Sequence, residues 1–287
     1  MPARKPPTER QRRLGAELRK MREHVGLSLT EAAVIHRTDK TTISNTESAR
    51  FGVSADRVRV WAANYSCTDR EYVDALAEMA RERRAAIRYW WDEYRDAGAT
   101  AMDLAEMEHH AVALRGVQIT HLPGLLQCED YTRAVLDEAV PSLVPEDLDR
   151  RVAFRMRRSG VLDLPQPPEC TFLIHEAALH MQFGGRKVVK KQLDHLLEQS
   201  ERERVTIRVV PFSSGAFPSA GSSTHYACGP VPQLDMVQVD VPTGPTFLHA
   251  ETQLANYRAV LDRMEQRSLG PGQSQDLIRG IAKGHGA

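Results

Sequence analysis

Residues 26–50, GLSLTEAAVIHRTDKTTISNTESAR, decide the fold of the N-terminal part of this chain. Ser28 and Glu31 have the spacing of a capping box, which predicts a helix from about Leu29 to His36. A short polar break and a second helix follow. The stretch therefore predicts two short helices joined by a tight turn.

The second helix is mostly polar. It begins behind Thr38 or Asp39 as its cap, and Ile43 is its only strongly apolar residue. Most of its surface must therefore face water or a ligand rather than a core. Hydroxyl, amide and ammonium groups at the start of a helix can reach base edges and phosphates in a DNA major groove, as in a helix-turn-helix. Such groups occur at Lys40, Thr41, Thr42, Ser44 and Asn45.

Apolar periodicity on both sides of this stretch predicts further helices. Residues 10–24 form an amphipathic helix, because apolar side chains recur there at spacings of four, three and four. The same kind of spacing follows at Val58, Trp61, Ala62 and Tyr65. The first 66 residues are therefore expected to form a bundle of four or five helices.

Charge is unevenly distributed along a chain that is neutral overall. The 287 residues carry 38 Lys and Arg and 38 Asp and Glu, yet residues 1–60 carry 13 basic and seven acidic side chains. The rest of the chain is correspondingly acidic. A basic N-terminal domain suits the neutralisation of nucleic-acid phosphates. The alternative is that some of these arginines only solvate exposed helix faces.

Residues 12–66 resemble the Cro and phage-repressor type of helix-turn-helix, the XRE family. The matching positions are Arg22, Gly26, Leu27, Glu31, Ala33, Ile43 and Glu47. The resemblance implies a structural ion pair between Arg22 and Glu47. It also implies a phosphate contact by Thr42 and base contacts by Lys40, Thr41, Ser44 and Asn45.

The same stretch departs from the family pattern at several positions. Arg37 and Ala49 stand where the family has glycine, and His36 and Thr46 replace apolar residues. Leu29 replaces a phosphate-contacting glutamine. A non-glycine residue in a left-handed turn costs about 1 kcal/mol, which folded proteins tolerate. The expected DNA-binding residues are Lys40, Thr41, Thr42, Ser44, Asn45, Arg37 and Arg50.

A long charged helix is predicted over about 69–96. Its apolar residues fall at heptad spacing, in a seam interrupted by Arg83. Such a seam can pair two subunits, as expected for a homodimer on two DNA half-sites, or pack onto the following domain. The predicted organisation is a helix-turn-helix domain at 1–66, a helical linker at 67–96 and a third part at 97–287.

Beyond residue 97 the pattern is mixed. A helix is predicted over 102–114, and a basic helix over 147–159 whose five arginines are expected to form a solvated face. Strands are predicted at 171–174, 205–210, 224–228, 236–241 and 246–249, with further helices at 188–200, 251–267 and 276–283. The fold class is therefore multidomain, an all-α N-terminal domain joined by a helical linker to an α+β domain.

Several short sequence motifs after residue 97 are specific to one group of proteins. They include LPGLLQ at 122–127, HEAAL at 175–179 and VVPF at 209–212. They resemble the C-terminal domain of actinobacterial regulators of the WhiJ-like and antitoxin-like type, over about residues 90–280. The resemblance implies a regulator and leaves open which ligand or partner this domain receives.

Enzyme and metal chemistry are not expected. His175 and His180 stand five residues apart instead of the four of a zinc-protease helix. The chain has no nucleophile elbow, phosphate-binding loop or dinucleotide-binding glycine pattern. The cysteines, more than 40 residues apart, are expected to be reduced thiols. We expect no catalytic residue, no metal and no cofactor.

The sequence predicts a sequence-specific transcriptional regulator, repressor-like and homodimeric, that binds double-stranded DNA. No apolar run approaches 18 residues and no secretory signal is recognised, so a cytoplasmic protein without membrane contact is expected. A small-molecule effector or a small partner protein is expected to control it. The alternative is an antitoxin-like protein that neutralises a small partner. Aromatic candidates for a ligand cavity, or simply for the core, are Trp90, Trp91, Tyr94 and Tyr131.

Overall fold

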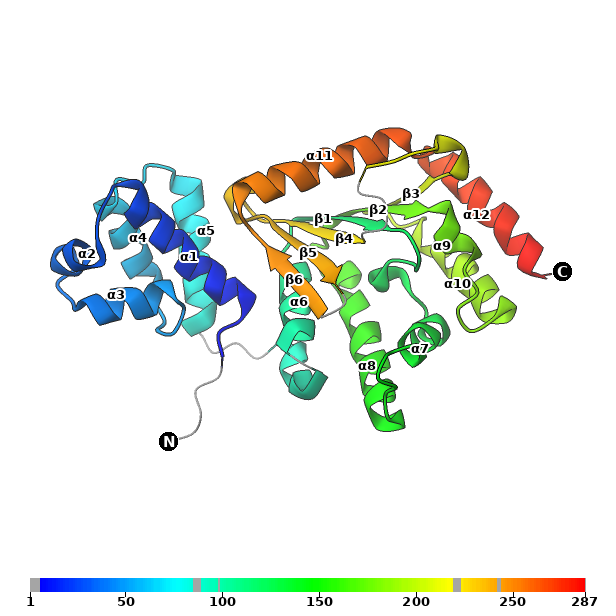
Figure 1. Ribbon diagram of the computed structural model, residues 1–287, viewed down its shortest axis with the longest axis horizontal. Coiled ribbons are helices and arrows are strands. Elements are labelled where there is room, and N and C mark those ends of the chain that lie inside the picture. Colours follow the sequence, from blue (N-terminus) through cyan, green and yellow to red (C-terminus); the bar gives the residue numbers. More distant parts are fainter. Residues whose placement is uncertain (1–5, 85–88, 98, 219–222, 242–243, 287) are drawn as a thin grey trace. The chain divides into compact units, whose positions relative to one another are not determined.

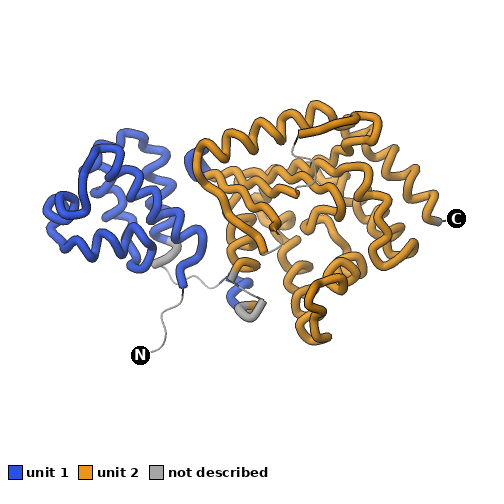
Figure 2. The backbone as a smooth tube through the Cα atoms, viewed as in Figure 1, with its two compact units in different colours: residues 1–92, 230–234 blue, residues 93–229, 235–287 orange. Residues whose placement is uncertain are grey.

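The computed structural model describes residues 6–84, 89–97, 99–218, 223–241 and 244–286. The chain divides into two compact units, shown in different colours in Figure 2. Unit 1 comprises residues 1–92 and 230–234, and unit 2 comprises residues 93–229 and 235–287. Each unit has a hydrophobic core of its own and is described by itself.

Unit 1 is helical, as predicted. Its described helices are α1 (Glu9–His24), α2 (Leu29–Ile35), α3 (Lys40–Glu47), α4 (Ala55–Asn64) and α5 (Arg70–Arg84), labelled in Figure 1. Thr8 and Ser28 begin their helices with complete capping boxes, and Asp39 and Ser54 cap α3 and α4. Leu18, Ile43 and Trp61 form the centre of the core. Local capping and apolar periodicity therefore explain this half of the fold.

The boundary of unit 1 differs from the predicted domain end at residue 66. Leu76, Ala77 and Ala80 of α5 are buried in its core, so α5 is part of the bundle rather than a linker. Part of the predicted heptad seam is thus used inside the unit. Residues 85–88, including Ile87, lie outside the described residues, and residues 90–97 form a 3₁₀ helix, η1, instead of continuing an α-helix.

A distant segment completes unit 1. Residues 230–234, with the short helix η5 (Pro232–Leu234), bury Val231 and Leu234 in the core of this unit. Arg13 donates a hydrogen bond to the carbonyl of Gln233, whose side-chain amide donates to Asp69 at 2.9 Å. Unit 1 is therefore discontinuous in the chain, which local periodicity did not predict.

Unit 2 is built on a mixed sheet with the strand order β3-β2-β1-β4-β5-β6. The strands are β1 (Ala113–Gln118), β2 (Glu169–His175), β3 (Val205–Val210), β4 (Thr224–Cys228), β5 (Met236–Val241) and β6 (Gly244–Leu248). Strands β1, β2 and β3 pair in parallel, whereas β4, β5 and β6 are added antiparallel. The predicted α+β fold of this unit is confirmed.

The central strand corrects the predicted helix over 102–114. Helix α6 (Ala99–His109) ends earlier, and residues 113–118 form β1 between β2 and β4. Only Leu114 and Val117 are strongly apolar in this strand, and Gly116 interrupts it. Its strand conformation depends on hydrogen bonding to two neighbours that are distant in sequence, so the local pattern was insufficient.

Helices cover both faces of the sheet. On one face, Leu114, Phe172 and Ile207 pack with α10 (Arg186–Gln199) and α12 (Pro271–Gly286). On the other, Leu173 and Val237 pack against α11 (Glu251–Arg267). The first face also carries η2 (Gly124–Leu126), η3 (Ser159–Asp163), α7 (Glu129–Asp137), α8 (Pro145–Arg158) and α9 (Glu176–His180) (Figure 1). No described helix is long and apolar enough to cross a membrane.

Candidate functional site

Helix α3 is held in place by its buried side. Ile43 is fully buried, and Thr46 and Glu47 follow it into the core of unit 1. At the other end, the carboxylate of Asp39 accepts the backbone N–H of Thr42 at 2.8 Å and caps the helix. Because Ile43, Thr46 and Glu47 fix its rotation, the opposite side of α3 faces solvent.

The ion pair expected between Arg22 and Glu47 ties α1 to α3. Arg22 Nε and Nη2 donate to the two carboxylate oxygens of Glu47 at 2.6 and 2.9 Å, in a bidentate arrangement. Arg22 Nη1 also donates to the carbonyl of Leu27 at 2.6 Å. The hydrogen bond to Glu47 raises the pKa of Arg22. This buried pair positions α3 relative to α1 and to the turn between α1 and α2.

The turn before α3 contains a non-glycine residue in the left-handed region. Arg37 has φ 50°, and Ala49, just after α3, has φ 58°. Both stand where the resembled family has glycine, and both take the glycine-like conformation. The backbone N–H of Thr38 closes the end of α2 by donating to the carbonyl of Ala33 at 2.9 Å. The turn is retained despite the strain.

His36 stands where the family pattern has an apolar residue, and it packs there against aromatic rings. Its ring lies 4.6 Å from that of Trp61 and 5.1 Å, edge-on, from that of Tyr65. Burial, followed by the charge of Arg57, lowers the pKa of His36. An imidazole that stays neutral can take the place of an apolar side chain here.

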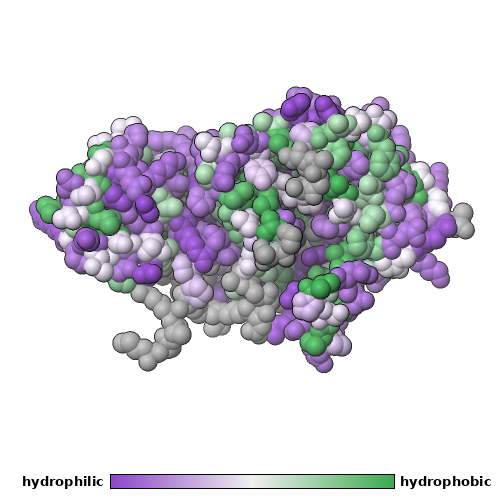
Figure 3. Space-filling view, in the orientation of Figure 1, coloured by the Kyte–Doolittle hydropathy of each residue, from purple (hydrophilic) through white to green (hydrophobic). Residues whose placement is uncertain are grey.

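The residues expected to bind DNA lie on α3 or within three residues of its ends. Their accessibility differs. The exposed ones are Arg37, Lys40, Thr41, Ser44 and Arg50, while Thr42 and Asn45 are half-buried. Over unit 1, the face drawn in Figure 3 is mostly hydrophilic. The chain thus places ammonium, guanidinium, hydroxyl and amide groups together around one short helix.

Thr42 fits its implied phosphate contact less well than the others. Its hydroxyl donates to the carboxylate of Asp39 at 2.6 Å, as part of the helix cap. These hydrogen bonds from Thr42 also lower the pKa of Asp39. A phosphate contact by Thr42 would require its hydroxyl proton to exchange partners.

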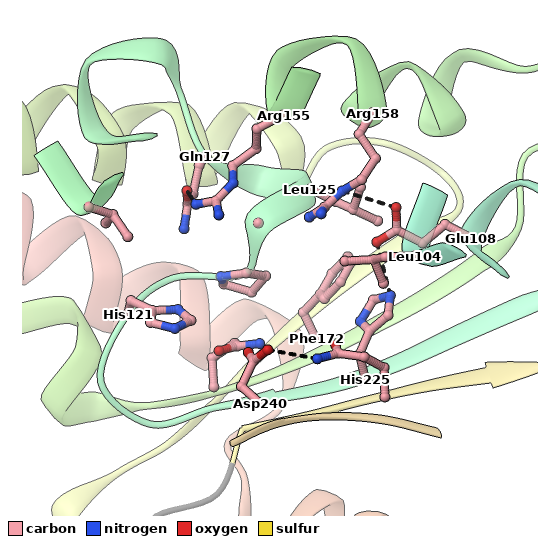
Figure 4. Close-up of a pocket in the computed structure, with 15 residues that line it drawn as sticks. Leu104, Glu108, His121, Leu125, Gln127, Arg155, Arg158, Phe172, His225 and Asp240 are labelled. Atoms are coloured by element: carbon pink, nitrogen blue, oxygen red, sulfur yellow. Dashed lines mark hydrogen bonds and ion pairs between the residues drawn. The ribbon is translucent and has the colours of Figure 1, made fainter. Parts of the chain in front are cut away.

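Unit 2 contains a polar pocket with a volume of about 140 Å³ (Figure 4). The sheet contributes Gln118, Phe172, His225, Gln238 and Asp240 from four strands. These residues point to the same face because strand positions alternate. The rest of the lining comes from α6, α7 and α8 and from the loop that contains residues 121–127.

A buried carboxylate stands at one side of the pocket. Glu108 is 1% exposed, and its two oxygens lie 3.0 Å from Arg158 Nε and 3.2 Å from His225 Nε2. Gly124 makes room for the arginine, since a Cβ at this position would lie 2.5 Å from Arg158 Nη2. The charge of Arg158 is therefore neutralised by Glu108.

Arg155 reaches the pocket from the same helix. Its Nη1 donates to Gln127 Oε1 at 2.9 Å, and Gln127 is itself fixed by donating to the carbonyl of Leu122 at 2.7 Å. Burial, and then the nearby charge of Arg158, lowers the pKa of Arg155 to about 10. The LPGLLQ phrase at 122–127 thus forms a wall that positions this guanidinium.

One prediction about this part of the chain is wrong. The basic helix is not simply a solvated face, because Arg155 and Arg158 turn into the pocket and Arg157 lies 2.5 Å from Glu93. Of the two alternatives for the aromatic residues, core or cavity, Tyr131 takes the first: it is fully buried in the core, and none of the four lines this pocket. The sequence contained one indication of this pocket: the polar residues Gln238 and Asp240 at alternate positions of β5.

His175 and His180 were the residues considered for a metal. His175 ends β2 and accepts the backbone N–H of Ala177 at 3.2 Å, whereas His180 lies on α9, 3.7 Å from Glu176. Within the described residues, no group of three or more His, Cys, Asp or Glu side chains is arranged to hold a metal ion. The four cysteines are free thiols.

Two family comparisons cover most of the chain. Residues 13–76 match a helix-turn-helix domain, and residues 101–280 match the domain of unknown function DUF5753. No curated protein and no solved structure matches the chain. The first match coincides with α1 to α5, and the second with the sheet and the pocket.

Proposed function

The chain belongs to the DUF5753 family and carries a helix-turn-helix domain, which supports a DNA-binding regulator; from this premise we propose a sequence-specific, repressor-like transcriptional regulator. It binds DNA as a homodimer through α3. Unit 2 receives a ligand or a small partner protein and changes operator affinity. The activity of the protein is binding, without catalysis or a cofactor.

The exposed polar side of α3 carries this proposal. Lys40, Thr41 and Ser44 are exposed next to the half-buried Asn45, on a helix whose other side is fixed in the core. Amide and ammonium groups are suited to the edges of adenine and guanine in a major groove. Arg37 is exposed beside them and is suited to phosphate contact.

The way in which helix-turn-helix proteins usually read DNA supports a homodimer. One helix of eight residues reaches only a few base pairs, and helix-turn-helix proteins usually bind two half-sites about one helical turn apart. A ligand that binds one arrangement of the dimer better than another then changes the affinity for DNA by thermodynamic linkage. The operator is expected to be two-fold symmetric.

The test is selection of genomic DNA fragments by the purified full-length protein, followed by affinity measurements over a range of salt concentrations. We expect enrichment of a two-fold symmetric site. The double substitution Lys40→Ala with Asn45→Ala should abolish selection while changing stability by less than about 0.5 kcal/mol. The matched control is Arg81→Ala on α5, which removes an exposed cation outside α3 and should leave selection unchanged.

Base and phosphate contacts can be separated in the same assay. Arg50→Ala should weaken binding to all sequences and reduce the slope of log affinity against log salt by about one. It should not change the selected sequence. Weak retention without sequence preference, unaffected by the double substitution, would contradict the regulator and favour the partner-binding, antitoxin-like alternative.

A further inference from the structure

The pocket of unit 2 contains one cation and one anion that form no ion pair with a described residue. Arg155 hydrogen-bonds to the neutral Gln127, and no described carboxylate forms an ion pair with it. Asp240 accepts a hydrogen bond from the neutral amide of Gln238 at 2.7 Å, and no described cation pairs with it. By contrast, Arg158 is already paired with Glu108.

These two groups face each other across the cavity. Figure 4 shows the guanidinium of Arg155 and the carboxylate of Asp240 on opposite sides of the pocket, with His121 beside them. Burial lowers the pKa of His121 and so favours its neutral ring. The two arginines and the two acids of the lining therefore balance each other.

The charges of the lining favour a zwitterionic ligand. Asp240 is exposed, so water can also solvate its carboxylate. A monoanion on Arg155 would still face this negative charge, and a phosphate monoester would place two negative charges near it. A cation would leave Arg155 without an anion. A ligand that carries both charges pairs with both groups and adds no net charge to the pocket.

The lining also contains apolar side chains, beside the polar Gln118 and His225. The apolar ones are Leu104, Pro123, Leu125, Val135 and Phe172. The volume of about 140 Å³ is several times the roughly 10–15 Å³ that admits one water molecule, and it suits a small metabolite rather than a peptide. Apolar walls next to two charged groups indicate a ligand with a short hydrocarbon part.

We propose that this pocket binds a free α-amino acid with an apolar side chain, whose carboxylate is held by Arg155 and whose ammonium group is held by Asp240. Guanidinium and carboxylate groups form charge-assisted hydrogen bonds with these two ends. Gln127 is a positioning residue, because it fixes the guanidinium through its own hydrogen bond to the backbone of Leu122. This deepens the proposed function, on which its regulatory meaning rests.

The experiment is calorimetric titration of the full-length protein, without DNA, with each of the common amino acids. Two analogues of L-leucine separate the charges: 4-methylpentanoate lacks the ammonium group and isoamylamine lacks the carboxylate. We expect an apolar amino acid to bind, and the analogue of that amino acid without either charged group to bind roughly ten-fold more weakly or worse. These comparisons need no substitution in the protein.

Substitutions then test which residue binds the carboxylate of the amino acid and which binds its ammonium group. Arg155→Met and Asp240→Asn should each weaken amino acid binding by roughly ten-fold or more. Arg151→Met is the matched control, because Arg151 is an exposed cation on the same helix and does not line the pocket. It should bind as the unsubstituted protein does.

Three results would overturn the proposal. They are no binding of any amino acid at about 10 mM, equal binding of 4-methylpentanoate and leucine, and binding that Asp240→Asn leaves unchanged. Since the titration contains no DNA, these outcomes are independent of operator binding. If the protein selects an operator but binds no amino acid, the proposed function stands and the ligand proposal fails. If it binds an amino acid but selects no DNA, only the ligand proposal stands.

Discussion

Unit 1 and unit 2 place their arginines in opposite ways. Around α3, Arg37 and Arg50 extend into solvent, where a large polyanion can reach them. On α8, Arg155 and Arg158 turn inward and line a small pocket. The difference is local: Arg37 and Arg50 lie in the exposed turns on either side of α3, whereas Arg155 and Arg158 lie on the side of α8 that lines the pocket.

The two units are alike in how they position these groups. Unit 1 contains the buried pair of Arg22 and Glu47, and unit 2 contains the buried pair of Arg158 and Glu108. Each acid is almost inaccessible, so neither charge could be stabilised by water if its partner were lost. Both pairs hold an element that carries a candidate binding residue.

The largest expected effect is the loss of one buried acid in either unit. Glu47→Gln and Glu108→Gln should each destabilise their own unit by about 3 kcal/mol, because an arginine is left buried without its counter-ion. All three tryptophans lie in unit 1, so tryptophan fluorescence during urea unfolding reports on that unit. Hydrogen exchange measured on peptides reports on unit 2.

If the two units are stabilised independently, each substitution should affect only its own unit. Glu47→Gln should lower the fluorescence midpoint, whereas Glu108→Gln should leave it unchanged and accelerate exchange in β1 and β4. Glu78→Gln, which removes an exposed pair with Arg81, is the control and should cost less than about 1 kcal/mol. An equal fall of the fluorescence midpoint with Glu108→Gln would show that the two units unfold together.

A smaller effect separates stability from DNA contact within unit 1. Arg37→Gly and Ser66→Gly each remove a non-glycine residue at positive φ, so both should stabilise the unit by about 1 kcal/mol or less. Only Arg37→Gly also removes a cation beside α3, and only this variant should bind DNA more weakly. Equal DNA affinity in the two variants would exclude Arg37 from the interface.

The smallest expected effect concerns His36 and pH. Because burial lowers its pKa in the folded state, the unfolded chain takes up the proton first as the pH falls. Full stability is therefore present above the unfolded value of about 6.5 and is lost as the pH falls through the folded value. His36→Phe keeps the ring stacking and removes this titration.

Thermal unfolding of the full-length protein at about pH 7.5 and about pH 5.5 measures this difference. The melting temperature of unit 1, followed by tryptophan fluorescence, should fall less in His36→Phe than in the unsubstituted protein. An identical fall in both proteins would mean that His36 does not titrate between these pH values. It would also remove the explanation of how a histidine replaces an apolar residue at this position.

Much of unit 1 and most strands of unit 2 could be predicted. The caps at Ser28 and Asp39 and the strand over 205–210 occur where expected, because each depends on neighbours within a few residues. The pocket could not be predicted from spacing. Glu108, Arg155 and Asp240 lie far apart in the chain, and nothing in their local sequence indicates a shared cavity.

The sequence by itself determined where α3 begins, which of its residues are polar, and the all-α and α+β character of the two parts. Only the tertiary structure decided that residues 113–118 become the central strand, that residues 230–234 join unit 1, and that two arginines of α8 face inward. Caps and periodicity are set by short-range hydrogen bonds and burial. Strand pairing such as Ala113 with Cys228, and the burial of a charge, depend on residues that are distant in the chain.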